Sequence, residues 1–274
     1  MIIEYAYAKI NLALEIINKR PDGFHDLKSL MIPISLKDEI IFTKGNGLNF
    51  ASNVAIKDNS IIKVYEVMKN RYNVSEGVSI SLIKNIPVGA GLGGGSADIA
   101  ATIRGLNQFW NLDLDSKEIR GLANELGSDT LFCLYNVAAK ITGRGDEIEF
   151  ISSSVKLNNI TLVVPNYMTM TKVAFEHVEF YQHDASKFDK LIEAYQQGDE
   201  AYVRDNLYND MLEANFKIHP SSRAYFKKLQ SKNLHPHLSG SGSVFYFIDL
   251  TTEAYMTLKE ITPREFEIIK TKQL

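Results

Sequence analysis

The apolar positions of the chain follow two periods, and these predict its first secondary structure elements. Alternating aliphatic side chains over residues 6–17, 30–42 and 77–86 are typical of half-buried strands, whereas residues 61–72 carry apolar side chains at helical spacing. Between the first two strands, residues 20–25 contain proline, aspartate and glycine. This composition predicts a loop whose tip carries an aromatic ring and an imidazole.

A glycine-rich segment, residues 87–96, is followed by two predicted helices. Intervals of four, three and four residues place four apolar side chains on one helical face: Ile99, Ile103, Leu106 and Trp110. The second helix begins at Asp115, where Glu118 completes a capping-box spacing, and it ends at Gly127. The order strand, glycine loop, helix is therefore predicted for this part of the chain.

The second half of the sequence predicts a further unit of mixed helices and strands. Residues 151–159 are polar and form a plausible boundary, after which residues 160–164 read as a new strand. A second glycine turn, residues 238–243, leads into another predicted strand at 244–248. We therefore expect an α+β protein with an N-terminal domain at 1–155 and a C-terminal domain at 156–274.

Composition narrows the classes of partner. The formal net charge is -3, with 30 basic and 33 acidic residues, so the chain lacks the basic excess that nucleic acids or anionic membranes would require. The N-terminal segment does not resemble a signal peptide, and no stretch reaches the length of a membrane span. The single cysteine, Cys133, lies in an apolar stretch and is expected to be a buried thiol in a cytoplasmic protein. A small-molecule ligand is the remaining expectation.

Residues 87–96 contain five glycines directly ahead of an amphipathic helix, and this arrangement suits a phosphate group. Glycines let backbone N–H groups close on an anion, and the helix N-terminus adds partial positive charge. A flexible linker is the alternative, although linkers rarely join a strand to such a helix. The Walker A pattern is absent because no Gly-Lys-Ser/Thr sequence closes the loop.

A dinucleotide-binding fingerprint is the main competing interpretation of the same glycines. Gly89, Gly91 and Gly94 satisfy its spacing, and Asp113 and Asp115 lie about 20 residues onward. In a dinucleotide fold, however, the acidic residue ends a second buried strand. Here the acidic residues fall in a predicted helix-to-helix connection, which makes that interpretation weaker.

Several motifs together resemble the kinase family named after galactokinase, homoserine kinase, mevalonate kinase and phosphomevalonate kinase. The similar segments are residues 8–12 with 20–25, residues 86–98, residues 126–129, residues 143–147 and residues 239–242. The resemblance covers almost the whole chain. It implies a two-lobed fold of that family, with the active-site cleft between an N-terminal and a C-terminal kinase domain.

The resemblance also implies an activity: ATP-dependent phosphorylation of the 2-hydroxyl of a cytidylyl alcohol in non-mevalonate isoprenoid precursor biosynthesis, by a monomer or homodimer. ATP and Mg²⁺ are the expected cofactors. Lys9 and Asp129 are the expected catalytic residues, with Asp129 accepting the proton of the attacking hydroxyl and Lys9 beside it. From position alone, a helix N-cap is the more frequent role for Asp129, and a solvated side chain is the default for Lys9.

The same resemblance assigns the binding residues. The expected ATP-binding residues are Pro87, Gly89, Gly91, Leu92, Gly93, Gly94, Gly95 and Ser96. The expected substrate-binding residues are Asn11, Phe24, His25, Thr171, Phe175, Ser239, Gly240, Ser241 and Gly242. Phe24 and Phe175 would sandwich the cytosine ring while His25 reads its edge, although without the resemblance the aromatic residues could be ordinary core side chains and His25 a loop histidine. His235 and His237 lack carboxylate or thiol companions, so a metal site there is not expected.

The chain departs from the pattern of this family at three places. They are Ala97, where a second serine is common; Thr130-Leu131, where valine and proline are usual; and residues 233–238, ahead of the last glycine motif.

Two other functions stay open. One is a related kinase that acts on another small alcohol. The other is a catalytically silent nucleotide-binding regulator, against which the presence of both Lys9 and Asp129 argues.

Overall fold

The computed structural model describes residues 1–56, 58–179, 183–184 and 186–274, and the chain forms two compact units. Unit 1 consists of residues 1–8, 36–87 and 93–136, and unit 2 of residues 9–35, 88–92 and 137–274. The units are interleaved along the chain, and two long strands, β1 (Ile2–Lys19) and β2 (His25–Lys44), contribute residues to both. The expected contiguous domains 1–155 and 156–274 stay a prediction.

Unit 1 contains a sheet in which β3 (Leu48–Ser52) and β4 (Val78–Ile83) extend the first part of β1 and the last part of β2 in the order β3-β4-β2-β1. β3 runs parallel to β4, and β4 runs antiparallel to β2. Side chains alternate between the faces of a strand, and so Ile40 and Phe42 of β2 lie buried opposite Leu82 and Ile80 of β4. The predicted strands at 30–42 and 77–86 are confirmed.

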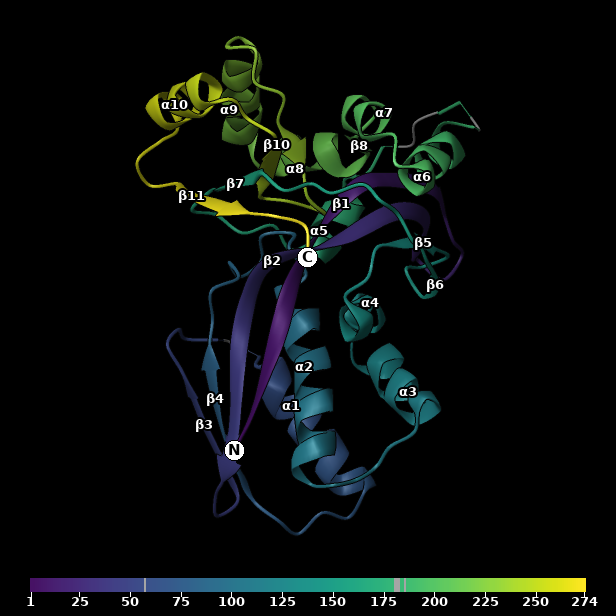
Figure 1. Ribbon diagram of the computed structural model, residues 1–274, viewed down its shortest axis with the longest axis vertical. Coiled ribbons are helices and arrows are strands. Elements are labelled where there is room, and N and C mark those ends of the chain that lie inside the picture. Colours follow the sequence, from purple (N-terminus) through teal and green to yellow (C-terminus); the bar gives the residue numbers. More distant parts are fainter. Residues whose placement is uncertain (57, 180–182, 185) are drawn as a thin grey trace. The chain divides into compact units, whose positions relative to one another are not determined.

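Helices pack on this sheet. The helices of unit 1 are α1 (Ser60–Arg71), α2 (Gly94–Phe109), α3 (Ser116–Leu126) and α4 (Thr130–Tyr135). Helices α1 and α2 lie side by side, as Figure 1 shows. α2 approaches the sheet closely at Gly105, where a β-carbon would collide with the ring of Phe42. The predicted apolar face of α2 is buried, and only Trp110 lies just beyond its last turn.

The connection from α2 to α3 has the predicted form. Asp115 accepts hydrogen bonds from the backbone of Lys117 and Glu118, both at 2.8 Å, and Glu118 accepts one from the Asp115 amide. This capping box starts α3, and Gly127 follows its last residue. Asp113 and Asp115 therefore lie between two helices rather than at the end of a second strand, which disfavours a dinucleotide fold.

Unit 2 holds the remaining elements. Its strands and helices are β5 (Ala139–Thr142), β6 (Glu147–Phe150), β7 (Ile160–Val164), α5 (Thr171–Glu176), α6 (Lys187–Gln197), α7 (Glu200–Asp205), β8 (Tyr208–Asn209), α8 (Met211–Ile218), α9 (Pro220–Gln230), β9 (His237–Leu238), β10 (Phe245–Ile248), α10 (Thr252–Ile261) and β11 (Glu267–Thr271). β5 pairs with β2 and with β6, and β8 pairs in parallel with β1.

A second sheet, of order β11-β7-β10-β9 and antiparallel throughout, carries the core of unit 2. All five residues of β7 are buried, and Phe245 and Phe247 of β10 pack with Leu229 of α9 and Leu258 of α10. The predicted strands at 160–164 and 244–248 are confirmed, the latter starting one residue later.

The Cys133 thiol is buried, as predicted. Within residues 1–56, 58–179, 183–184 and 186–274, none of the helices combines the length and apolar character needed to cross a bilayer.

Candidate functional site

The first half of the glycine segment, residues 88–92, is fixed inside unit 2 by the second glycine turn. Gly91 has a φ of 80°, and a β-carbon at this position would collide with the carbonyl oxygen of Ser239. The Ser239 hydroxyl donates a hydrogen bond to the Gly91 carbonyl at 2.9 Å, and the Val244 amide donates one to the Ala90 carbonyl. Only glycine fits at position 91, because the chain needs both a left-handed φ and this close approach.

The second half of the segment starts α2 in unit 1. Gly93 is the N-cap of α2 with a φ of 71°, and Gly94, Gly95 and Ser96 form its first turn. The first turn contains no acidic residue among its described positions. The amides of this turn and the helix dipole therefore offer a positive end with small side chains, which is the predicted geometry for a phosphate group.

Gly89, Leu92 and Pro87 complete the predicted ATP-binding residues. Gly89 has a φ of 66° and accepts a hydrogen bond from the Thr169 amide, while the Leu92 carbonyl accepts one from the Lys9 amide at 3.0 Å. The Leu92 side chain is buried. Leu92 thus anchors the loop in unit 2 through its backbone, and Pro87 ends the connection from β4.

Lys9 and Asn11 belong to one buried network in unit 2. Lys9 Nζ donates to Asn11 Oδ1 at 2.8 Å, and Asn11 Nδ2 donates to the Ser29 hydroxyl at 2.8 Å. Ser29 in turn donates to the Ala13 carbonyl at 2.6 Å. Since Lys9 is only 4% exposed, its ammonium group is not the solvated lysine of the alternative interpretation.

The second glycine turn joins this network. The Gly240 amide donates to Asn11 Oδ1 at 3.0 Å, and a β-carbon on Gly240 would lie 3.3 Å from Lys9 Nζ. The Asn209 side chain supports the turn by donating to the carbonyls of Leu238 and Gly240. Lys9, Asn11 and the turn at 239–242, predicted separately from the sequence, therefore lie together.

Asp129 occupies the N-cap position of α4 in unit 1. This is the position that the N-cap alternative predicts, although in the described part of the chain the carboxylate makes no capping hydrogen bond to the helix amides. The start of α2 lies nearby, because a β-carbon on Gly127 would be 2.6 Å from Thr130 Oγ1 and 3.6 Å from Ser96 Oγ. Lys9 belongs to unit 2 and Asp129 to unit 1, and their expected adjacency stays a prediction.

Two of the three predicted base-binding residues, His25 and Phe175, are in contact in unit 2. The rings of His25 and Phe175 stack with centroids 5.0 Å apart and planes 25° apart. Burial, with a smaller contribution from Lys19, lowers the pKa of His25, which favours the neutral imidazole. Phe24 is 58% exposed, and the guanidinium of Arg144 lies 5.4 Å from its ring centroid. His25 thus contacts Phe175 directly, and a cytosine between Phe24 and Phe175 stays a proposal.

Thr171 and Ser241 form a second polar pair in unit 2. Their hydroxyl oxygens are 3.3 Å apart. The buried Asn215 side chain donates to the Ser241 carbonyl and to Thr169 Oγ1, and Gly242, with a φ of 89°, lies against Asn215. The two predicted substrate-binding segments, 171–175 and 239–242, are therefore linked through hydroxyl and amide groups.

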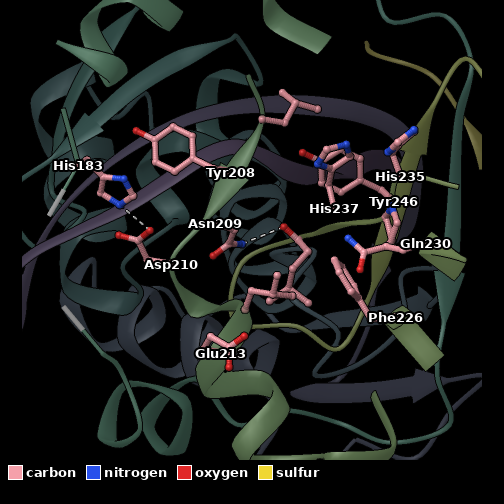
Figure 2. A pocket seen from close by; sticks show the side chains of 14 residues that line it. His183, Tyr208, Asn209, Asp210, Glu213, Phe226, Gln230, His235, His237 and Tyr246 are labelled. Carbon is pink, nitrogen blue, oxygen red and sulfur yellow. Dashed lines mark hydrogen bonds and ion pairs between the residues drawn. The ribbon is translucent and has the colours of Figure 1, made fainter. Parts of the chain in front are cut away.

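A pocket of about 420 Å³ in unit 2 adjoins the second glycine turn, because Asn209 and Leu238 are among its lining residues (Figure 2). His183 is hydrogen-bonded to Asp210 on one side of it, while His235 and His237 lie on another. Burial, with a smaller contribution from His235, lowers the pKa of His237 to about 4. The described residues include no cluster of His, Cys, Asp and Glu suited to a metal ion.

Four residues that sequence reasoning did not select support the site: Ser29, Asn209, Asn215 and Arg144. Their partners are distant in the sequence, since Asn11 and Ser29 are 18 residues apart and Asn209 and Gly240 are 31 apart. Local patterns therefore carried no signal for the first three. Arg144 was visible within the motif at 143–147, but its position over Phe24 was not.

Comparison with known proteins agrees with this geometry. Residues 59–137 match the model of the GHMP kinases N terminal domain. A 4-diphosphocytidyl-2-C-methyl-D-erythritol kinase of Caldanaerobacter subterraneus subsp. tengcongensis is 35% identical over 94% of this chain and 93% of its own length. The chain belongs to the 4-diphosphocytidyl-2-C-methyl-D-erythritol kinase family of GHMP kinases.

Other comparisons agree with the assignment to GHMP kinases. A relative of the same name from Bacillus mycoides is 37% identical, covering 78% of this chain and 76% of the relative. A crystal structure of 4-(cytidine 5'-diphospho)-2C-methyl-D-erythritol kinase superposes with a TM-score of 0.81 at 24% identity, covering 100% of both chains. A mevalonate kinase structure gives a TM-score of 0.71 at 16% identity, covering 100% of this chain and 99% of the other. The predicted α+β GHMP kinase fold is confirmed, and as a GHMP kinase this chain uses ATP.

Proposed function

We propose that this chain transfers the γ-phosphate of ATP to the 2-hydroxyl of 4-diphosphocytidyl-2-C-methyl-D-erythritol, a step in isoprenoid precursor biosynthesis. The observation that carries the proposal is the 35% identity to a kinase of that name over 94% of the chain. The arrangement of the predicted site residues supports it from the physical side.

ATP binding is assigned to residues 87–96. The backbone amides at the start of α2 and the left-handed glycines before them leave room for phosphate oxygens, and no carboxylate of the first helical turn opposes them in the described structure. Phosphoryl transfer depends mainly on positioning and charge neutralisation, which a rigid loop and a helix N-terminus provide.

Proton removal is assigned to Asp129, with Lys9 in support. A carboxylate in a fixed position can accept the proton of the attacking hydroxyl, and Asp129 is fixed at the first turn of α4, in the same unit as the start of α2. Lys9 is held by Asn11 and lies beside Gly240, so its ammonium group has a fixed position from which to attract an oxyanion or hydroxyl group. Asn11 acts as a positioning residue for Lys9 as well as a candidate substrate contact.

Recognition of the cytidylyl group is assigned to Phe24, His25 and Phe175, with Thr171 and residues 239–242 holding the rest of the alcohol. The exposed ring of Phe24 offers a face for stacking, and a neutral His25 can both donate and accept hydrogen bonds at the edge of a base.

Mg²⁺ is part of the proposal as the ion that neutralises the ATP phosphates. Such an ion is held mainly by phosphate oxygens, with one or two protein oxygens. The Ser96 hydroxyl in the first turn of α2 is the candidate protein ligand.

One experiment tests the substrate assignment. ADP release is measured with ATP, Mg²⁺ and one of four alcohols: the cytidylyl alcohol, mevalonate, homoserine or galactose. We expect kcat/KM for the cytidylyl alcohol to exceed the others by at least about 100-fold, because a stacked and hydrogen-bonded base adds roughly 3 kcal/mol. Equal values would favour a kinase for another alcohol, and no turnover with any of them would favour the silent regulator. The oligomeric state, a monomer or homodimer, also stays a prediction.

A further inference from the structure

Three charged side chains form a buried cluster in unit 1, outside the residues assigned so far. Lys84 Nζ donates to Asp38 Oδ2 and to Asp98 Oδ2, each at 2.6 Å. The side chains of Lys84, Asp38 and Asp98 are 5%, 0% and 5% exposed. Buried charges are costly to desolvate, so such a cluster is weak evidence for net stability and calls for another role.

The two carboxylates are held differently. Asp38 Oδ1 accepts hydrogen bonds from the amides of Asn85 at 2.6 Å and Ile86 at 2.7 Å, so Asp38 fixes the backbone that leaves β4. Lys84 and Asp38 by themselves form a charge-balanced pair. Asp98 is the additional carboxylate, and its other oxygen, Oδ1, has no hydrogen-bond partner among the described residues.

The cluster lies at the start of α2. A β-carbon on Gly94 would lie 3.1 Å from Lys84 Nζ and 2.9 Å from Ile86 Cγ2. Asp98 is one helical turn beyond Gly94 on the same helix. The ion pair between Asp98 and Lys84 thus ties the first two turns of α2 to the end of β4, directly beside the amides to which the proposed function assigns the ATP phosphates.

We propose that Asp98, acting through Lys84, is a positioning residue for the phosphates of ATP. The tie holds the first turn of α2 in place, so that the amides of residues 94–96 need no rearrangement when the phosphates bind. Preorganised donors bind an anion more tightly than donors that must first be ordered. This inference rests on the proposed assignment of the ATP phosphates to that turn.

The substitution Asp98→Ala tests the tie with little disturbance of charge, because it leaves the balanced pair of Lys84 and Asp38. We expect it to raise KM for ATP about tenfold. A change of this size matches the loss of one charge-assisted hydrogen bond, here the one between Asp98 and Lys84. KM for the alcohol and kcat should stay within about threefold of the wild type. Asp98→Asn keeps an oxygen acceptor for Lys84 and should restore KM for ATP to within about twofold.

A control on the same helix separates positioning from stability. Arg104→Gln removes hydrogen bonds to Glu4 and to the carbonyls of Tyr5 and Cys133, so it should destabilise unit 1. Because Arg104 lies away from the first turn, KM for ATP should stay at the wild-type value. If Asp98→Ala does not fold, Asp98→Leu provides the same test with a side chain of similar size.

Calorimetric titration with a non-hydrolysable ATP analogue distinguishes the possible failures. Tight binding by the wild type and about tenfold weaker binding by Asp98→Ala supports the inference. Equal binding by the two proteins, or an asparagine variant as impaired as the alanine variant, overturns it and leaves the proposed function standing. A wild type that binds no nucleotide overturns both.

Discussion

Lys9 Nζ and Asn11 Oδ1 are joined by a hydrogen bond of 2.8 Å between side chains on the same face of β1. The same Asn11 oxygen accepts the Gly240 amide, while its Nδ2 donates to Ser29. One asparagine therefore fixes a buried ammonium group relative to the glycine turn at 239–242. The orientation of that asparagine depends on Ser29, a residue of β2.

Ser29→Ala is the first prediction. It removes the acceptor of Asn11 Nδ2 in a buried site, so the free energy of unfolding should fall by about 1–3 kcal/mol and kcat should fall with it as Lys9 loses its fixed position. Ser35→Ala is the control, because Ser35 is on the same strand and its hydroxyl meets Thr271 instead. Urea denaturation and steady-state kinetics measure both effects. Full kcat in the Ser29 variant would contradict the proposed positioning.

Asp129→Asn is expected to lower kcat about 10²–10⁴-fold, the usual contribution of a positioned general base. The melting temperature should stay near the wild-type value, because asparagine keeps the size of the side chain and one of its oxygen acceptors. The control is Asp115→Ala, which removes a helix cap. Asp115→Asn would not serve, because asparagine also caps helices. The alanine variant should lose about 0.5–2 kcal/mol of stability with normal kcat. An Asp129 variant with near-normal turnover would remove the assignment.

Gly95→Ala tests the assignment of the phosphates to the first turn of α2. A β-carbon at Gly95 would meet no atom within 4 Å, so the free protein should keep or gain stability, by up to about 1 kcal/mol. We expect KM for ATP to rise about tenfold, because the added methyl group would crowd a phosphate near the helix N-terminus. Gly121→Ala in α3 is the matched control: its β-carbon is equally open, and only stability should change. Unaltered nucleotide affinity in the Gly95 variant would count against phosphates at this turn.

The dependence of stability on pH should reveal Asp98. Burial raises its pKa to about 7, with Asp38 adding to the rise and Lys84 opposing it. The folded state thus holds a proton that the unfolded state releases near pH 4, so this group stabilises the fold at low pH, and that stabilisation is lost as pH rises through about 7. Urea midpoints at pH values from about 5 to 8 should fall for the wild type and change less for Asp98→Asn. Parallel curves for the two proteins would show that Asp98 does not titrate in this range.

Features that depend on neighbours in the sequence were predictable, and features that depend on distant pairing were not. The capping box of Asp115 and Glu118 and the buried face of α2 follow from spacing within one or two turns. The period of a strand likewise placed Lys9 and Asn11 on the same face.

The hydrogen-bond and ion-pair partners of the site residues could not be predicted from the neighbouring sequence. Ser239 and Gly91 are 148 residues apart, and Lys84 and Asp38 are 46 apart. Nothing near Lys84 or Asp38 in the sequence indicates which of the many charged residues pair inside the protein. The chemistry-bearing residues themselves were found only because several motifs together resembled one family.

Phosphorus NMR of a reaction mixture tests the central claim most directly. The mixture contains the purified protein, ATP, Mg²⁺ and 4-diphosphocytidyl-2-C-methyl-D-erythritol. We predict a new phosphomonoester signal on the cytidylyl compound that grows in step with ADP and is slowed about 10²–10⁴-fold by Asp129→Asn. ADP formed without that phosphomonoester, or no consumption of ATP at all, would contradict the account.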